Sequence, residues 1–376
     1  FFFLLLLIQN THKDTHNNAL DFVQIEQKMA EDNPAKWMEG NWGVRFLLPA
    51  TGNGKKLDQF NVENVMQQLR PLKSTCKWVQ INASQGANGA YYTTPVSVLS
   101  EHVSKESVPE RDLFGEVLDA LLEEGFKVIV YFASEGPTKR KGHEEYAPPG
   151  SIKKWKDYCT SRNMTYEEGV AKLVVREISM RYKEKISGWW FDHAHFGDIE
   201  LLAKEALRGN ADAALTFNIG PENNPDGSRV LKRARAEEHY TCGHPTPMVK
   251  RSPDWDGNES MIRTIENHGP YLDGSLAHMF IPMQEKWFAG KACFKKKKIV
   301  DWTLRVVKAG GAITWATALE DKKVIPEKQL RQLEKINRVV GRWKKREEGC
   351  EEEEDTDDEE EDTDNEEEES EGKDEL

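Results

Sequence analysis

The sequence predicts a parallel α/β fold, a (β/α)8 TIM-type barrel followed by a disordered acidic tail. Seven short strand-like segments alternate with helix-like segments between Trp42 and Trp343, and such a series builds a parallel sheet. No GxGxxG turn follows any of these strands, which counts against a doubly wound dinucleotide-binding sheet. We therefore expect a leader over residues 1–20, one barrel domain over 35–345 and the tail over 346–376.

The expected strands are short, rich in β-branched or aromatic residues, and end near glycine, proline or polar residues. They cover residues 42–48, 77–82, 127–133, 188–192, 214–219, 278–282 and 312–316. The sixth strand of an eight-stranded barrel is missing from this series. We expect it near residues 236–241, within the least regular part of the sequence.

Three of the expected helices have clear beginnings. Ser107 and Glu110 form a capping-box pattern, which predicts that a helix starts there. Thr165 and Glu168 form a second such pattern and predict a helix that leads into the fourth strand. A third helix is expected over residues 326–343, where apolar residues recur on one face.

The negative charge of the chain belongs to its tail. The 376 residues carry a formal net charge of −13, and residues 347–376 hold 21 acidic residues and one lysine. The remainder holds 51 basic and 44 acidic residues and is therefore about +7. A segment as acidic as the tail cannot bury apolar area, so we expect it to be disordered and to bind Ca²⁺ weakly, with no cofactor required. The lysine run 295–298 is expected to be a solvated helix face, and nucleic acid is not an expected partner.

Both ends of the chain predict the lumen of the endoplasmic reticulum. Residues 1–8 are apolar but too few to cross a bilayer, and they are typical of the remnant of a secretory signal. The chain ends in Lys-Asp-Glu-Leu, the retention signal that the KDEL receptor binds. No other run is apolar enough for a transmembrane anchor, and Asn82, Asn163 and Asn258 begin N-glycosylation triplets. The five cysteines lack CxxC spacing, which excludes a zinc ribbon and a thioredoxin-like motif.

Asp192 is the first candidate for chemistry. It ends the fourth expected strand, directly after Trp189, Trp190 and Phe191. Active sites of (β/α)8 barrels lie at the C-terminal ends of the strands. A carboxylate that follows an apolar run lies in a partly desolvated pocket, where it acts as a nucleophile or as an acid/base. The alternative interpretation is a helix N-cap or a loop carboxylate.

Four segments in this order resemble glycoside hydrolase family 29, the α-L-fucosidases, across residues 37–343. They are WGVRF at 42–46, ERDLFGEVLDALLEEGFKVIVY at 110–131, GWWFD at 188–192 and IVDWTLRVVKAGGAI at 299–313. The resemblance implies a retaining mechanism with Asp192 as the nucleophile. It also implies a later acid/base carboxylate, for which Glu238 or its neighbour Glu237 has a suitable separation and Glu259 is the reserve. The alternative for Glu237 and Glu238 is a solvated helix face.

The expected substrate is a carbohydrate or a glycoconjugate. Family 29 has substrate-contacting polar residues where Asn218 closes the fifth strand, and His193 and His195 lie within three residues after Asp192. The complete set of expected sugar contacts is Arg45, Asn82, Trp190, His193, His195, Asn218 and Glu259.

Two other functions are compatible with these residues. The family's HWG and HHDGF motifs, whose histidines hold the fucose hydroxyls, are replaced here by Leu47-Leu48-Pro49 and by residues 82–88. This departure favours a non-catalytic carbohydrate-binding or Ca²⁺-buffering protein on a hydrolase barrel. His193, His195 and His239 with Asp192 allow a metal-dependent hydrolase. The place of His193 and His195 at the end of the fourth strand fits that class poorly, and we expect no metal.

Overall fold

The computed structural model describes residues 31–85, 91–137, 148–220, 231–244, 257–285, 291–321 and 323–349. The expected leader, the C-terminal tetrapeptide and the run of acidic residues after Gly349 lie outside these residues. Within the described part, no helix combines the length and the apolar composition needed to cross a membrane.

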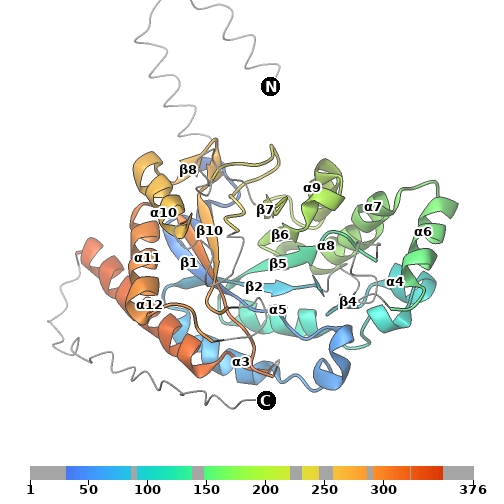
Figure 1. Ribbon diagram of the computed structural model, residues 1–376, viewed down its shortest axis with the longest axis horizontal. Helices are drawn as coiled ribbons and strands as arrows, with labels where there is room; N and C mark the ends of the chain where they lie inside the picture. The colour runs from blue at the N-terminus through green and yellow to red at the C-terminus, as the bar shows by residue number, and fades with distance from the viewer. Residues whose placement is uncertain are drawn as a thin grey trace, which may run out of the picture.

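Seven parallel strands form one curled sheet, as expected from the sequence (Figure 1). Their order across the sheet is β10-β11-β1-β2-β5-β6-β7. The strands are β1 (Asn41–Arg45), β2 (Cys76–Asn82), β5 (Lys127–Ala133), β6 (Gly188–Asp192), β7 (Ala214–Phe217), β10 (His278–Pro282) and β11 (Ala312–Ala316). Two small antiparallel pairs accompany this sheet, β3 (Ser84–Gln85) with β4 (Tyr91–Tyr92) and β8 (Tyr271–Leu272) with β9 (Ser275–Leu276).

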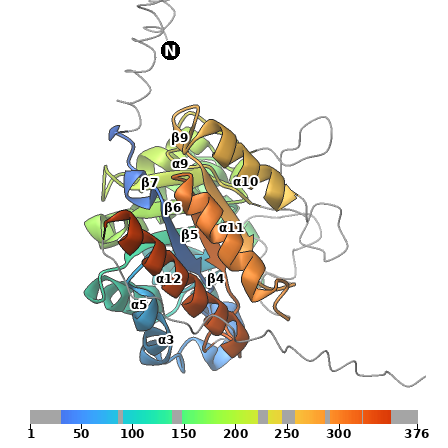
Figure 2. The ribbon, with the colours of Figure 1, turned by 90° about the vertical axis from the view of Figure 1, so that its left-hand side faces the viewer.

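Helices cover the outer face of the sheet (Figures 1 and 2). The α-helices are α3 (Val62–Leu69), α4 (Ser97–His102), α5 (Leu113–Glu123), α6 (Ser151–Ser161), α7 (Tyr166–Gly169), α8 (Arg176–Tyr182), α9 (Ile199–Ala206), α10 (Gly257–His268), α11 (Lys296–Lys308) and α12 (Glu327–Glu347). Short helical turns are η1 (Lys36–Met38), η2 (Thr51–Lys56), η3 (Arg70–Leu72), η4 (Lys105–Ser107), η6 (Val170–Val175), η7 (Lys183–Lys185) and η8 (Ala194–Phe196).

The two faces of the sheet bury two separate apolar cores. Side chains alternate along each strand, so Val130 and Phe132 of β5 pack against the helices, whereas Ile129 and Tyr131 join a smaller cluster on the concave face. That inner cluster includes the rings of Trp78, Trp190, Tyr240 and Phe280. The concave side is therefore filled by aromatic side chains, and only the ends of the strands remain for a site.

Two of the three expected helix beginnings are confirmed. The capping box at Thr165 and Glu168 is present, and α12 follows Pro326. The capping box at Ser107 and Glu110 is wrong, because α5 begins at Leu113. Asp112 is its N-cap, since its side chain accepts a hydrogen bond from the Gly115 amide.

Of the three glycosylation triplets, only Asn163 is exposed. Asn258 is buried at the start of α10, and Asn82 is fully buried. The Asn82 side chain accepts a hydrogen bond from Leu48 N at 2.6 Å and donates one to Leu48 O at 3.3 Å. Asn82 therefore ties the chain after β1 to the end of β2, and a glycan at this position is incompatible with the fold.

The expected sixth strand at residues 236–241 does not form a regular strand. Instead, an irregular segment lies between the two edges of the sheet. On one side His239 N donates to Leu215 O of β7 at 2.9 Å, and on the other side Thr241 N donates to Leu276 O at 2.9 Å. Phe280 N of β10 donates to Gly243 O at 3.0 Å. Both edge strands thus find hydrogen-bond partners in residues 239–243.

Gly243 is the position where this segment comes closest to β10. Its φ is +63°, and a Cβ atom there would lie 2.1 Å from His278 O and 2.6 Å from the Met279 Cα. We predict that Gly243→Ala lowers the free energy of unfolding by about 2–4 kcal/mol, because the added methyl group would clash with the backbone of β10, which is fixed by its sheet hydrogen bonds. Urea denaturation followed by tryptophan fluorescence measures this loss.

Gly125→Ala is the matched control. Gly125 also has a positive φ, +86°, but a Cβ atom there meets nothing within 4 Å. Its loss should be about 1 kcal/mol, from backbone strain alone. Equal losses in both variants would contradict the close packing of residues 239–243 against β10.

Candidate active site

The carboxylate of Asp192 lies at the C-terminal end of β6 and is buried. Its Oδ2 accepts a hydrogen bond from the Tyr131 hydroxyl at 2.5 Å. Its Oδ1 accepts one from Asn218 Nδ2 at 2.7 Å and one from the His193 amide at 3.0 Å. Three donors therefore fix the orientation of both oxygens.

These donors come from neighbouring strands whose parallel register aligns their ends. Ala133 of β5 pairs with Asp192, so Tyr131, two residues earlier on the same face, lies beside Trp190. The rings of Tyr131 and Trp190 stack with centroids 5.5 Å apart. Asn218 follows β7, and its amide donates to Phe191 O at 2.7 Å. The register of β5, β6 and β7 thus brings the side chains of Tyr131, Asp192 and Asn218 together.

Asp192 is held ionised. Burial raises the pKa of this carboxyl, but the charges of His193 and His244 and the hydrogen bonds from Tyr131 and Asn218 outweigh burial, so the pKa lies below its ordinary value. Burial and the charge of Asp192 raise the pKa of Tyr131 well above its ordinary value, so the phenol remains a donor. A buried carboxylate that stays charged at neutral pH is suited to act as a nucleophile.

Arg45, at the end of β1, adds a buried cation to the site. Its guanidinium lies over the rings of Tyr131 and Phe280, 5.2 Å and 5.7 Å from their centroids. Burial lowers the pKa of Arg45 to about 10, although Tyr131 and Asp192 act in the opposite direction. The guanidinium is therefore still charged at neutral pH.

A second buried carboxylate, Glu135, follows the end of β5. Its Oε1 lies 2.5 Å from His193 Nδ1, and His193 Nε2 lies 3.6 Å from Asp192 Oδ2. Burial raises the pKa of Glu135 above its ordinary value, because it outweighs the opposing effect of His193. The imidazole of His193 therefore lies between two buried carboxylates.

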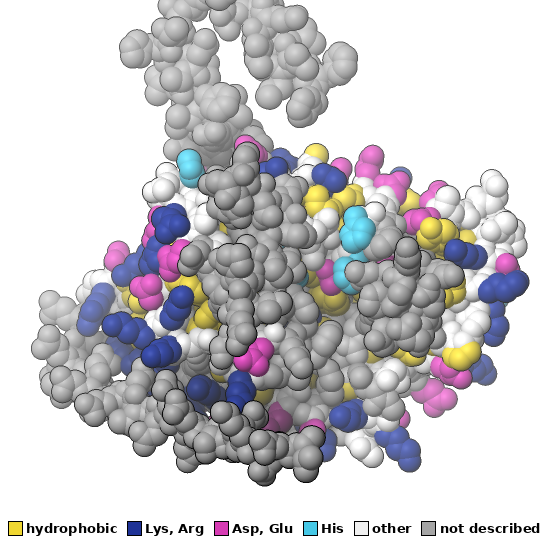
Figure 3. All heavy atoms as spheres, viewed as in Figure 1, with side chains coloured by type: hydrophobic (Ala, Val, Ile, Leu, Met, Phe, Trp, Pro, Cys, Tyr) yellow, Lys and Arg dark blue, Asp and Glu magenta, His cyan; other side chains and the backbone are white. Residues whose placement is uncertain are grey.

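His244 lies over the aromatic side chains next to Asp192, at the end of the segment between the sheet edges. Its ring stacks on Phe280 and Trp190, with centroids 6.0 Å and 5.9 Å apart. Its charge contributes to the lowered pKa of Asp192, which places the imidazole within Coulombic range of the carboxylate. His195 is exposed, with its ring 6.3 Å from that of His193. Figure 3 shows histidine side chains beside hydrophobic and acidic ones near the middle of this face.

Glu238 is buried but is surrounded by backbone donors. Its Oε1 accepts from Phe217 N at 3.1 Å and from the Thr216 hydroxyl at 3.3 Å. Its Oε2 accepts from Ala234 N at 2.6 Å and from Arg235 N at 3.3 Å. Burial raises its pKa and these donors lower it, with burial dominant. The carboxylate thus accepts a hydrogen bond from the edge of β7 that the backbone of a neighbouring strand would otherwise accept. Glu237 lies half-buried in the turn before Glu238.

The structure does not bring three other expected residues into open contact with this site. Glu259 lies on α10, where it accepts hydrogen bonds from Trp302 and Arg305 of α11 on the outer layer. The side-chain amide of Asn82 is hydrogen-bonded to the backbone of Leu48. The ring of Trp190 is buried between those of Tyr131 and Phe280. Arg45, His193, His195 and Asn218 do gather around Asp192.

No group of three or more His, Cys, Asp or Glu side chains in the described ranges could hold a metal ion. His239, which the metal-dependent alternative required, accepts a hydrogen bond from Leu215 N through Nδ1. Burial lowers the pKa of His239 to about 4. Its neutral ring therefore acts as a hydrogen-bond acceptor for the edge strand β7.

Tyr131, Glu135 and His244 were not expected from the sequence. A signal existed for two of them, because Tyr131 and Glu135 lie at the C-terminal end of β5, where barrel active sites form. His244 had no such signal, since it follows an irregular segment.

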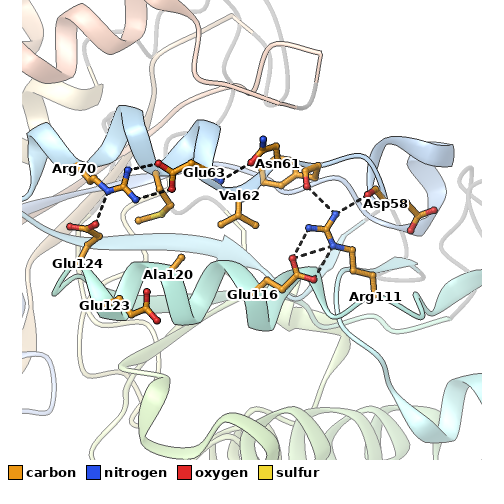
Figure 4. Close-up of a pocket in the computed structure, with 12 residues that line it drawn as sticks. Asp58, Asn61, Val62, Glu63, Arg70, Arg111, Glu116, Ala120, Glu123 and Glu124 are labelled. Carbon is orange, nitrogen blue, oxygen red and sulfur yellow. Dashed lines mark hydrogen bonds and ion pairs between the residues drawn. The ribbon is translucent and has the colours of Figure 1, made fainter.

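A surface groove between α3 and α5 lies apart from Asp192 (Figure 4). Its charged lining is internally paired, since Arg70 contacts Glu63 and Glu124. Arg111 likewise contacts Glu116. The pair of Arg70 with Glu124 links the end of α3 to the end of α5, and the groove lies on the outside of the sheet.

Glu238 and Glu237 are adjacent in sequence and differ sharply in structure, which allows a direct test. We predict that Glu238→Ala lowers the free energy of unfolding by about 3 kcal/mol, because it leaves buried donors unsatisfied. Glu237→Ala should change it by about 0.5 kcal/mol or less. Urea denaturation of both variants decides this, and equal effects would contradict the structural role of Glu238.

Solved structures share this fold. A variant of the endo-fucoidan hydrolase MfFcnA4, from glycoside hydrolase family 107, matches with a TM-score of 0.72 and 20% identity over 82% of this chain and 54% of that chain. The endo-fucoidan hydrolase P5AFcnA matches with a TM-score of 0.71 and 18% identity over 82% and 93%. This chain thus spans about half the length of the MfFcnA4 chain and most of P5AFcnA.

Structures of α-L-fucosidases match less closely. Isoenzyme 1 from Paenibacillus thiaminolyticus has a TM-score of 0.53 and 16% identity over 85% of this chain and 77% of that chain. The resemblance to family 29 therefore holds for the general fold of fucose-active glycoside hydrolases, and family 29 itself is not specifically supported. No curated protein matches the chain. The family model described as endo-alpha(1,4)-fucoidanase Mef1 matches residues 32–231 and 220–348, more than half of the sequence, so the chain belongs to this family.

Proposed function

We propose that this protein is a retaining glycoside hydrolase that cleaves α-linked fucose within a fucose-containing polysaccharide. The observation that carries the proposal is the buried, ionised carboxylate of Asp192, fixed by Tyr131 and Asn218 at the C-terminal end of a parallel strand. Membership of the Mef1 family and the fold shared with endo-fucoidan hydrolases support this substrate class.

In the first step Asp192 attacks the anomeric carbon of the sugar. The C1–O bond to the leaving sugar breaks, a C1–Oδ ester bond forms, and the leaving oxygen receives a proton. We propose that His244 donates this proton. Its imidazole lies near Asp192 on the aromatic floor formed by Trp190 and Phe280, whereas the oxygens of Glu238 already accept four hydrogen bonds.

In the second step water attacks the same carbon. His244, now neutral, takes the proton from the water, the C1–Oδ bond breaks, and its electron pair returns to Asp192. Arg45, His193 and His195 remain the proposed contacts for the hydroxyl or anionic groups of the sugar, since all three lie near Asp192.

We further propose that residues 238–244 complete the barrel. They occupy the gap between β7 and β10 and hydrogen bond to both edges, although they form no regular strand. The same segment ends in His244. In this proposal, the residues that close the sheet therefore also position the proton donor.

The kinetic test uses three variants on a fucan with α-linked fucose units and on an aryl α-L-fucoside. Asp192→Asn should reduce kcat on both substrates by about 10⁴-fold while substrate binding is retained, because an amide cannot form the ester. His244→Gln should reduce kcat/KM on the fucan by about 10²–10⁴-fold, and far less on an aryl substrate whose leaving group needs no proton. Turnover of the aryl substrate should then be limited by the second step, which also lacks its base. Added azide should restore turnover of the aryl substrate by His244→Gln.

Glu238→Gln is the control, and it should show neither leaving-group dependence nor azide rescue. Gel separation of the fucan products tests the endo mode, which predicts a ladder of oligosaccharides with little free fucose. A wild-type protein that cleaves neither substrate, or full activity in Asp192→Asn, would contradict the proposal. Azide rescue of the Glu238 variant would move the proton donor to Glu238.

A further inference from the structure

Glu135 is a buried carboxylate that the proposed reaction does not use. It lies two residues beyond the end of β5 and is 2% exposed. A carboxylate in such a place is unfavourable unless a positive or hydrogen-bonding partner compensates for lost hydration. His193 Nδ1, 2.5 Å from Glu135 Oε1, is that partner.

His193 is held in an unusual backbone conformation. Its φ of 52° and ψ of 36° lie in the left-handed region, which a residue with a side chain adopts only at an energetic cost. This conformation lets the His193 amide donate to Asp192 Oδ1 while its ring turns back over Asp192 Oδ2, at 3.6 Å. Asp192 therefore contacts the backbone amide and the Nε2 atom of His193, and Glu135 contacts its Nδ1 atom.

The charges around the ring favour its protonated form. Glu135 faces Nδ1 and Asp192 faces Nε2, while the ring of His195 lies 6.3 Å away. Arg45, Tyr131 and His244 face Asp192 from the other elements, and Tyr92 of β4 lies within Coulombic range of Glu135. The short distance between Nδ1 and Glu135 Oε1, together with the ionised carboxylate of Asp192 on the other side of the ring, favours a proton on both ring nitrogens.

We propose that Glu135 is a positioning residue that keeps His193 protonated against Asp192, so that Asp192 leaves the glycosyl-enzyme more readily. When water attacks C1, the C1–Oδ bond breaks and negative charge returns to Asp192 beside the His193 cation. His193 keeps its proton, and the proton of the water goes to His244. The kinetic part rests on the proposed function, whereas the protonation of His193 does not.

The first experiment measures protonation without activity. The full chain is labelled with ¹⁵N histidine, the His193 signal is identified by its loss in His193→Gln, and its titration is followed by NMR. Wild-type His193 should remain protonated through pH 8. Its titration midpoint should fall by about one pH unit or more in Glu135→Gln, which removes the charge and keeps the shape.

Glu205→Gln is the matched control for the loss of a buried carboxylate. Glu205 is 1% exposed and pairs with Arg176 and Arg208 on the outer helices. It should leave the midpoint of His193 unchanged, and Glu135→Asp, which keeps the charge, should restore much of the wild-type value. An unchanged midpoint in Glu135→Gln would overturn the proposal. If Glu135→Gln does not fold, wild-type His193 that loses its proton below pH 6.5 overturns it equally.

The second experiment measures the consequence for catalysis. The enzyme is trapped with 2-deoxy-2-fluoro-α-L-fucosyl fluoride, excess reagent is removed, and the rate of reactivation is recorded against pH. The ratio of the Glu135→Gln rate to the wild-type rate should be near one at pH 5, where His193 is protonated in both. It should fall about tenfold by pH 8, where only the wild type keeps the cation.

A merely structural role for Glu135 would lower this ratio equally at every pH, which would overturn the positioning role. Glu205→Gln should give a ratio that does not vary with pH. If no trapped enzyme forms and no substrate is cleaved, the proposed function fails, while the NMR titration still decides whether Glu135 holds the proton on His193.

Discussion

A buried carboxylate that must stay ionised is the constraint on which this structure depends. Asp192 loses hydration at the end of β6, and an unpaired charge there would be too costly to keep. The protein meets this cost with Tyr131 from β5, Asn218 after β7 and the amide of His193. Those donors arrive together only because the parallel strands end in register. The aromatic floor under the site follows, since Tyr131 stacks on Trp190.

The second consequence concerns the two edges of the curled sheet. A regular eighth strand would satisfy the edges of β7 and β10 with backbone alone. Here Glu238 and the ring of His239 supply acceptors to β7 instead, and Thr241 and Gly243 bond to the opposite side. This irregular arrangement lets the chain bring His244 over Phe280 and Trp190, on the aromatic floor of the site. Glu238 therefore lies close in sequence to the proposed proton donor, His244, but its carboxylate has a structural role as an acceptor for backbone amides.

The strands and Asp192 were predictable because their signals are local. Apolar runs mark the strands, and the residue at a strand's C-terminal end marks the site. His193 and Asn218 were expected near Asp192, but the roles of Glu135 and His244 were not predictable. Glu135 reaches Asp192 only through the left-handed turn at His193, and His244 follows a segment without periodicity. Glu238 had the right spacing for an acid/base, but spacing does not reveal that backbone amides occupy its oxygens. The pattern at Ser107 likewise could not show that Asp112 caps the helix.

Covalent trapping tests the central claim, that Asp192 is the nucleophile, most directly. The full chain is incubated with 2-deoxy-2-fluoro-α-L-fucosyl fluoride, alone and extended by α-linked fucose units, then digested and analysed by mass spectrometry. We predict one fucosyl adduct, on the peptide that contains Asp192, and none in Asp192→Asn. A label on another carboxylate, or an enzyme that cleaves fucan with inversion at the anomeric carbon and is never labelled, would contradict this account.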